Sequence, residues 1–107
     1  MREIQNIQDY NETLGQNKPV LVDFFADWCG PCQALMPILN NFSQKNKGQV
    51  EVLKVNVDKH PELAQQFGVR SIPALFFIED KKVAHKLVGL QSESRLQESL
   101  DSILATS

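Results

Sequence analysis

The chain has 107 residues, of which 42% are hydrophobic and 22% are charged, and its formal net charge is -2. This length suits one domain with its own hydrophobic core, and the composition excludes an intrinsically disordered chain. The weak negative charge gives no electrostatic basis for binding nucleic acid or an anionic membrane. We therefore expect a single domain over residues 1–107.

The chain contains two cysteines, and its N-terminal residues lack the apolar stretch of a signal peptide. No segment of the sequence approaches the length needed to span a membrane. These features predict a cytoplasmic protein, although a mature chain whose signal had been removed would show them too. In a reducing cytoplasm, a cysteine pair serves catalysis or metal binding more often than structure.

The first predicted elements lie before the cysteines. A short edge strand is expected at 4–7 and a helix at 9–14, where Asp9 and Glu12 have the spacing of a capping box. In residues 20–26, apolar side chains occupy both the odd- and the even-numbered positions, which point to opposite faces of a strand. This pattern predicts a strand that is covered on both faces.

A helix and a second strand are expected next. Pro37 lies within the predicted helix and should kink it. The apolar residues of this helix have the spacing of a single face: Leu35, Ile38, Leu39 and Phe42. Residues 50–58 are typical of a strand, and two strands joined through a helix form a right-handed parallel unit.

The C-terminal half predicts a hairpin between two helices. Pro61 should open a short helix that ends at the C-cap glycine Gly68. Residues 74–78 and 83–88 predict the hairpin, although its turn lacks the usual glycine. The last helix is expected after Ser92, a suitable N-cap, and its buried face comprises Leu96, Leu100, Ile103 and Leu104. The whole pattern predicts one α/β domain in which helices cover a mixed sheet.

Cys29 and Cys32 lie between the strand at 20–26 and the helix that follows it. Two thiols separated by two residues can close a disulfide ring, so the pair can carry two electrons and two protons. Open α/β sheets bind their ligands at this end of a strand. If Cys29 lies at the start of the helix, unpaired N–H groups and the helix dipole favour its thiolate. Between the cysteines, Gly30 allows a tight turn and Pro31 is tolerated in a first helical turn.

Two other uses of the cysteine pair are less favoured. Tetrahedral zinc needs four ligands, whereas the sequence has no second cysteine pair and places His60 and His85 singly. We therefore expect no metal. A purely structural disulfide across two residues would close almost no loop and would stabilise the fold little. Redox chemistry is the favoured interpretation.

The residues around the cysteines resemble the active site of the thioredoxin family, in the segment Phe24-Phe25-Ala26-Asp27-Trp28-Cys29-Gly30-Pro31-Cys32. The likeness extends over most of the chain, including 22–24, Pro37, 55–58, 67–73 and 88–89. It implies a thioredoxin-like three-layer sandwich, with a central mixed five-stranded sheet flanked by four helices. It also implies a thiol–disulfide oxidoreductase that reduces protein disulfides and binds no cofactor. Its reducing equivalents would come from NADPH through a flavin-containing thioredoxin reductase.

The resemblance also implies roles for individual residues. Cys29 would be the exposed nucleophile that attacks a target disulfide, and Cys32 the buried thiol that resolves the mixed disulfide. Trp28 would shield the pair and contact partners, with ordinary packing as the alternative. Ile72 and Pro73 would face the cysteines through a cis peptide, and the backbone of Ile72 would pair with the substrate chain.

Asp23 interrupts the apolar strand at 20–26, and a buried carboxylate is costly unless it is paired or protonated. Burial should raise the pKa of Asp23, and a nearby lysine would lower it; Lys54 on the neighbouring predicted strand is the candidate. One interpretation is a structural buried pair. The other, which the resemblance supports, makes Asp23 the proton acceptor for Cys32.

The sequence departs from the family pattern at four positions. Gln33 replaces a usual lysine, Phe25 a common tryptophan, Met36 a common alanine and Ala74 a common threonine. These changes bear on the choice of partners and on the redox potential rather than on the reacting groups.

Two functional alternatives stay open. An oxidant or isomerase is the first, because a fold does not fix the direction of electron flow. Gly30 and Pro31 favour the reducing direction, since strong oxidants and isomerases of the family usually carry histidine there. The second alternative is a binding module with incidental thiols, which the presence of Asp23 and Pro73 argues against.

Gly89 would let a partner's backbone come close, unless it only ends a strand. The small domain, without an evident exposed apolar stripe, predicts a monomer.

Overall fold

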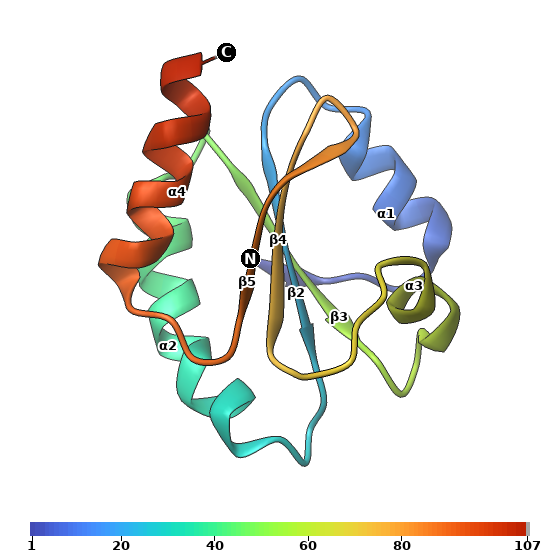
Figure 1. Ribbon diagram of the computed structural model, residues 1–107. Coiled ribbons are helices and arrows are strands. Elements are labelled where there is room, and N and C mark those ends of the chain that lie inside the picture. The colour runs from blue at the N-terminus through green and yellow to red at the C-terminus, as the bar shows by residue number, and fades with distance from the viewer. Residues whose placement is uncertain (107) are drawn as a thin grey trace.

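Helices cover both faces of the central strand β2 (Val20–Phe25), and each of its six residues is buried. The computed structural model describes residues 1–106 (Figure 1). In chain order, the elements are β1 (Arg2–Glu3), α1 (Ile7–Leu14), β2, α2 (Gly30–Lys45), β3 (Glu51–Asn56), α3 (Pro61–Gln66), β4 (Ala74–Glu79), β5 (Lys82–Val88) and α4 (Glu93–Thr106). The strand predicted at 20–26 is thus confirmed, covered on both faces.

The five strands form one mixed sheet in the order β1-β3-β2-β4-β5. β2 and β3 are parallel and are joined through α2, as predicted. β4 runs antiparallel to β2, and β5 antiparallel to β4. Figure 1 shows α2 and α4 on one face of the sheet and α1 and α3 on the other, so the predicted three-layer sandwich is confirmed. No helix within residues 1–106 combines the length and the apolar character needed to cross a membrane.

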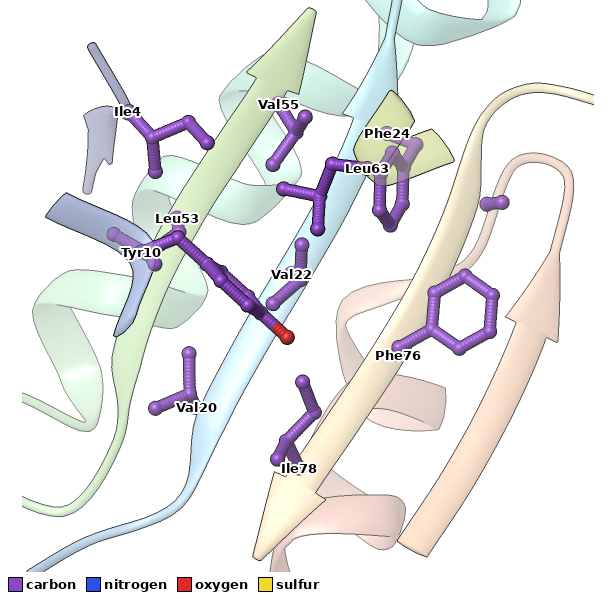
Figure 2. Close-up of a cluster of buried hydrophobic side chains, with 11 residues drawn as sticks. Ile4, Tyr10, Val20, Val22, Phe24, Leu53, Val55, Leu63, Phe76 and Ile78 are labelled. Atoms are coloured by element: carbon purple, nitrogen blue, oxygen red, sulfur yellow. The ribbon is translucent and has the colours of Figure 1, made fainter. Parts of the chain in front are cut away.

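Alternate residues of β2 contribute to two separate hydrophobic cores. Val20, Val22 and Phe24 pack in one core with residues of α1 and α3 (Figure 2). Leu21 belongs to the other core, beneath α2 and α4. This second core contains the predicted faces of both helices: Leu35, Leu39, Phe42, Leu96, Leu100 and Ile103 are buried, with Ile38 and Leu104 partly buried at its edge.

The predicted N-terminal elements are shifted along the chain. The strand expected at 4–7 is wrong, because β1 ends before residue 4 and α1 already begins at Ile7. Asn6 caps this helix, its Oδ1 accepting a hydrogen bond from the Asp9 N–H (2.9 Å). The capping box expected at Asp9 and Glu12 is therefore wrong as well, because the N-cap of α1 lies one helical turn earlier.

The predicted helix boundaries in the C-terminal half are confirmed. Gly68 follows the C-cap of α3 with a φ of +67°, a conformation that favours glycine. Ser92 Oγ accepts a hydrogen bond from the Arg95 N–H (3.1 Å) and so caps α4. Pro61 opens α3, and Pro37 lies inside α2, where the kink stays a prediction.

The hairpin between β4 and β5 turns through two residues in the left-handed region, Asp80 (φ 52°) and Lys81 (φ 65°). Glu79 pairs with Lys82 across this turn. Such two-residue turns match the twist of the strands, and glycine is their usual second residue. A left-handed backbone costs a residue other than glycine about 1–2 kcal/mol. The missing glycine therefore leaves Lys81 in a strained conformation.

Replacing Lys81 by glycine should raise the free energy of unfolding by about 0.5–1 kcal/mol, because relief of the left-handed backbone exceeds the extra chain entropy of glycine. Denaturant titration measures the difference. Lys82→Gly is the matched control: Lys82 lies in β5 without a positive φ, so glycine there should destabilise the fold. Equal or lower stability of Lys81→Gly would contradict the strained turn.

Candidate active site

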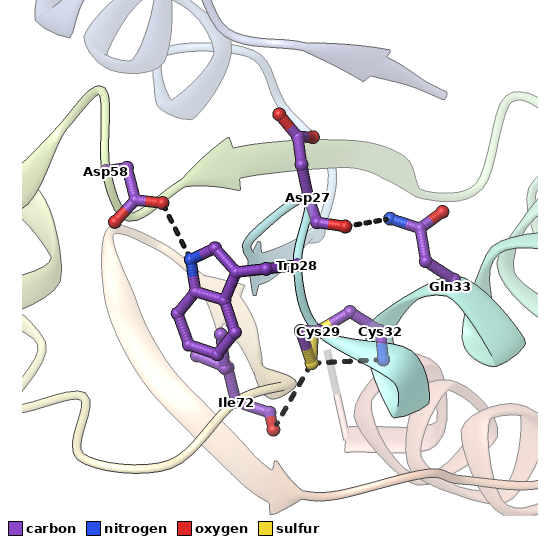
Figure 3. Close-up of a disulfide and its surroundings, with 7 residues drawn as sticks. All are labelled: Asp27, Trp28, Cys29, Cys32, Gln33, Asp58 and Ile72. Carbon is purple, nitrogen blue, oxygen red and sulfur yellow. Dashed lines mark hydrogen bonds between the residues drawn. A yellow bond between two sulfur atoms is a disulfide. The ribbon is translucent and has the colours of Figure 1, made fainter.

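Cys29 lies where β2 leads into α2 and forms the N-cap of that helix. Its backbone is extended (φ -93°, ψ 111°), and the N–H of Cys32 donates to the Cys29 Sγ (3.2 Å; Figure 3). A sulfur at this position faces unpaired N–H groups and the positive end of the helix dipole, which stabilise negative charge on it. The predicted position of Cys29 at the helix start is confirmed.

Cys29 and Cys32 are joined in a disulfide, with their Cα atoms 5.2 Å apart. Cys32 is fully buried, and Cys29 retains 5% of its surface. The expectation that Cys29 is exposed is therefore wrong in degree, because it packs in a cluster with Phe25 and Ala26. We call these four residues the disulfide cluster. Cys29 is still the more accessible of the two cysteines.

The two residues between the cysteines lie in the first turn of α2. Pro31 causes no loss there, since a first-turn N–H has no partner in the helix. Gly30 does not use its conformational freedom, because its φ lies outside the left-handed region. The chain therefore turns from Cys29 into α2 without a backbone conformation that requires glycine. A Cβ at Gly30 would meet no atom within 4 Å, so glycine instead leaves open space next to Cys29.

Trp28 stands on the surface next to Cys29 in the chain. It is 72% exposed, and its Nε1–H donates to Asp58 Oδ2 (3.0 Å; Figure 3). This exposure rules out ordinary core packing, the alternative weighed for Trp28. Asp58 lies in the turn after β3, and sequence reasoning assigned it no role; only the family likeness of 55–58 marked the segment. Gln33, at the position of the usual lysine, donates through Nε2 to the Asp27 carbonyl (3.4 Å).

The Ile72–Pro73 peptide is cis, as the resemblance implied. The Ile72 carbonyl oxygen lies 3.8 Å from the Cys29 Sγ, where it can accept a hydrogen bond from the thiol of reduced Cys29. The Pro73 carbonyl accepts a hydrogen bond from the Gly89 N–H (2.8 Å). Gly89 has a φ of +89°, and a Cβ there would meet nothing within 4 Å. These contacts bring the three predicted residues together beside the disulfide.

Two exposed aliphatic side chains flank Gly89. Val88 is 50% exposed and Leu90 is 53% exposed, although sequence reasoning found no exposed apolar stripe. That expectation is wrong at this place. The sequence pattern that could have revealed these two residues is a pair of large aliphatic side chains on either side of a glycine at the end of a predicted strand.

Asp23 is fully buried in β2, and neither of its carboxylate oxygens accepts a hydrogen bond within residues 1–106. It lies in register with Lys54 of β3 and Leu75 of β4. The Lys54 Nζ lies over the Phe25 ring instead, 5.3 Å from its centroid. The structural pair considered for Asp23 is therefore wrong as a direct contact. Burial raises the pKa of Asp23 to about 7, and the charge of Lys54 opposes this rise.

The two histidines weighed as metal ligands lie apart from the cysteines. His60 precedes α3, and the His85 ring packs edge-on against Phe77 of β4. In the part of the chain that the structure describes, no group of three His, Cys, Asp or Glu side chains is placed to hold a metal ion.

A disulfide beside an open surface can exchange with the thiols or disulfides of another molecule. This chemistry and the three-layer architecture define the class of the protein: a thiol–disulfide oxidoreductase with the thioredoxin fold. A family profile described as Thioredoxin matches residues 2–102. The chain belongs to the thioredoxin family.

Individual relatives agree with this assignment. A thioredoxin of Alicyclobacillus acidocaldarius subsp. acidocaldarius is 38% identical over 96 residues, which cover 90% of this chain and 91% of that protein. A bifunctional thioredoxin reductase/thioredoxin of Mycobacterium leprae is 34% identical over 102 residues, covering 95% of this chain and 22% of that protein. The solved structure of a mutant thioredoxin from Halobacterium salinarum has a TM-score of 0.86 at 35% identity, covering 94% of this chain and 87% of that one. As a member of this family, the chain reduces protein disulfides.

Asp23→Ala should stabilise the oxidised protein above neutral pH and lose this gain in acid. The pKa of the Asp23 carboxyl is about 7 in the folded protein and about 4 in an unfolded chain. The folded protein therefore becomes less stable relative to the unfolded chain as the pH rises between these two values. At roughly 1.4 kcal/mol per pH unit, the gain at about pH 8 is at most about 4 kcal/mol, less the cost of the small cavity. Denaturant titrations at about pH 4 and about pH 8 measure it. A gain of equal size at both pH values would contradict ionisation as the cause.

Proposed function

We propose that the protein reduces target disulfides in two steps, in which Cys29 attacks and Cys32 resolves. The observation that carries this assignment is the hydrogen bond from the Cys32 N–H to the Cys29 Sγ at the N-cap of α2. This donor and the helix dipole stabilise a thiolate on Cys29. The remaining exposure of Cys29, against none for Cys32, supports the same order of attack.

The electrons balance across two exchanges. The Cys29 thiolate attacks one sulfur of the target disulfide, an S–S bond forms between them, and the second target sulfur leaves as a thiolate. The Cys32 thiolate then attacks the Cys29 Sγ, closes the intramolecular disulfide and expels the first target sulfur. The leaving group of this second exchange is the first target sulfur, and the proximity of Cys32 to the attacked Cys29 Sγ supplies a high effective concentration. The protein loses two electrons and the target gains them.

Asp23 is the base for the second step in this proposal. Cys32 must lose its proton before it attacks, and Asp23 shares a sheet face with Phe25, which packs in the disulfide cluster with Cys32. With a pKa of about 7, the Asp23 carboxyl can accept a proton through water near neutral pH and release it again. Lys54 tunes that pKa downward through its charge.

The substrate chain would bind across the surface beside the disulfide. Exposed apolar side chains supply contact area there, and the open space at Gly30 and Gly89 lets a partner's backbone approach. In this proposal the backbone of Ile72 pairs with the substrate chain, while Gly30 and Pro31 set the redox properties of the ring. The residues of this surface are Trp28, Ile72, Pro73, Val88, Gly89 and Leu90.

Regeneration of the dithiol needs an electron donor outside this chain. We assign this role to a flavin-containing thioredoxin reductase that draws on NADPH, with no cofactor bound to this chain itself. The relative from Mycobacterium leprae, a bifunctional thioredoxin reductase/thioredoxin, supports a reductase as partner.

The proposal places the protein in the cytoplasm as one domain over residues 1–107 that acts as a monomer. A redox-active pair with no further cysteine suits a reducing compartment. The net charge of -2 supports protein partners rather than nucleic acid or an anionic membrane. Sedimentation of the purified protein tests the monomer, and a stable dimer would contradict it.

Cys32→Ser should accumulate a mixed disulfide between Cys29 and its target, because the first exchange proceeds and nothing resolves it. Non-reducing electrophoresis of the reduced variant with oxidised insulin measures the adduct. Cys29→Ser is the matched control and should form little adduct, since Cys32 is buried. Adduct formation that is stronger in Cys29→Ser than in Cys32→Ser would reverse the two roles.

Asp23→Ala should slow the second exchange at neutral pH by roughly tenfold or more, because a positioned base contributes at least that much to proton transfer. Rapid mixing of the reduced protein with dithiobis(nitrobenzoate) separates the steps, since each releases one coloured thiolate. The first release should keep its wild-type rate. If the second release also kept its rate from neutral to mildly alkaline pH, Asp23 would have no part in the mechanism.

A further inference from the structure

Met36 lies on α2 and contacts two groups of buried side chains. It packs against the core beneath α2 and α4 and against the disulfide cluster, while part of its own surface stays accessible. Among the partly buried hydrophobic residues that the structure describes, Met36 is the one that packs against both groups. It therefore forms a boundary between solvent and the interior at this point of the helix.

Asp23 lies between the same two groups on the strand below. Leu21, two residues earlier on the same face of β2, belongs to the core beneath α2 and α4. Phe25, two residues later on that face, belongs to the disulfide cluster. Asp23 on the strand and Met36 on the helix that covers this face thus both lie where the two groups adjoin.

The groups that face Asp23 offer its carboxyl no hydrogen bond. β4 places Leu75 beside it, and β3 places Lys54, whose Nζ lies over the Phe25 ring. The cysteine pair lies at the start of α2 and packs with Phe25 of the same strand face, and both carboxylate oxygens are buried without a partner in residues 1–106. Proton exchange at Asp23 therefore depends on how much water reaches it.

We propose that Met36 is a positioning residue for the resolving step: its side chain covers Asp23 on the solvent side and limits the water that reaches the carboxyl. The proposal rests on Asp23 as the base for Cys32. An unbranched thioether fills an irregular gap without offering a strong hydrogen bond, which suits such a cover. The family commonly has alanine at this position and tryptophan at Phe25, so this chain has more aliphatic volume on α2 and less aromatic volume on β2.

Three substitutions of Met36 distinguish the effect of covering Asp23 from the effect of side-chain volume. Met36→Ala removes the cover, Met36→Gln keeps the length but brings a polar group, and Met36→Leu keeps an apolar cover as the matched control. The rate of the second thiolate release from dithiobis(nitrobenzoate) is recorded against pH for each reduced protein.

In Met36→Ala and Met36→Gln we expect the midpoint of this pH profile to fall by about 0.5–1 pH unit, because hydration favours the carboxylate. At a pH below the wild-type midpoint, the second release should then become roughly two- to fivefold faster. Met36→Leu should keep the wild-type midpoint.

An unchanged midpoint in Met36→Ala and Met36→Gln would overturn the proposal, as would an equal shift in Met36→Leu. A lower melting temperature without a shifted profile is the result of packing alone and also counts against it. Should Met36→Ala fail to fold, Met36→Gln decides the outcome.

Asp23→Asn distinguishes failure of this inference from failure of the proposed function. If the wild-type pH profile survives in Asp23→Asn, the base assignment fails, and the role of Met36 fails with it. If Asp23→Asn loses the profile while the Met36 variants leave it unchanged, only the inference about Met36 is wrong.

Discussion

The hydrogen bond from the Cys32 N–H to the Cys29 Sγ makes two chemically identical thiols unequal, and the rest of the site depends on it. It exists because Cys29 caps α2, and Pro31 favours this start of the helix, since a first-turn N–H has no helical partner to lose. β2, buried on both faces, fixes where that helix starts and which way its dipole points. The core of the protein therefore decides which sulfur lies at the positive end of the helix dipole.

Asp23 is the second constraint, and it opposes stability. The other five positions of β2 are apolar, and a leucine at position 23, like the one at position 21, would carry no electrostatic cost. The carboxyl is instead buried without a hydrogen bond, so the fold keeps a group whose ionisation it penalises. The proposed transfer of a proton at the cysteine pair would account for a residue that the packing of β2 does not require. The two cores, with large aromatic and aliphatic residues on both faces of the sheet, supply the stability that tolerates it.

The long elements were predictable from the sequence, because burial on both faces requires a continuous apolar run in β2 and burial on one face imposes a period of 3.6 on α2 and α4. The N-terminal boundary was not, since Asn6 and Asp9 are equally good N-caps and only tertiary packing chooses between them. For the site, the order of elements placed Cys29 at a helix start and Lys54 beside Asp23. The contact between Trp28 and Asp58 joins positions 30 residues apart, and no local pattern contains it.

The position of Lys54 bears on the proposed role of Asp23 as a base. A direct ion pair would hold Asp23 ionised, and a carboxylate held in that way is a poor proton acceptor near neutral pH. With its Nζ over the Phe25 ring, Lys54 lowers the cost of the charge without contacting the carboxyl. Cover by apolar side chains acts in the opposite direction, because it removes water from the same group. The pKa of about 7 is the balance of these two influences, so a substitution on either side should move the reaction along the pH scale before it disturbs the fold.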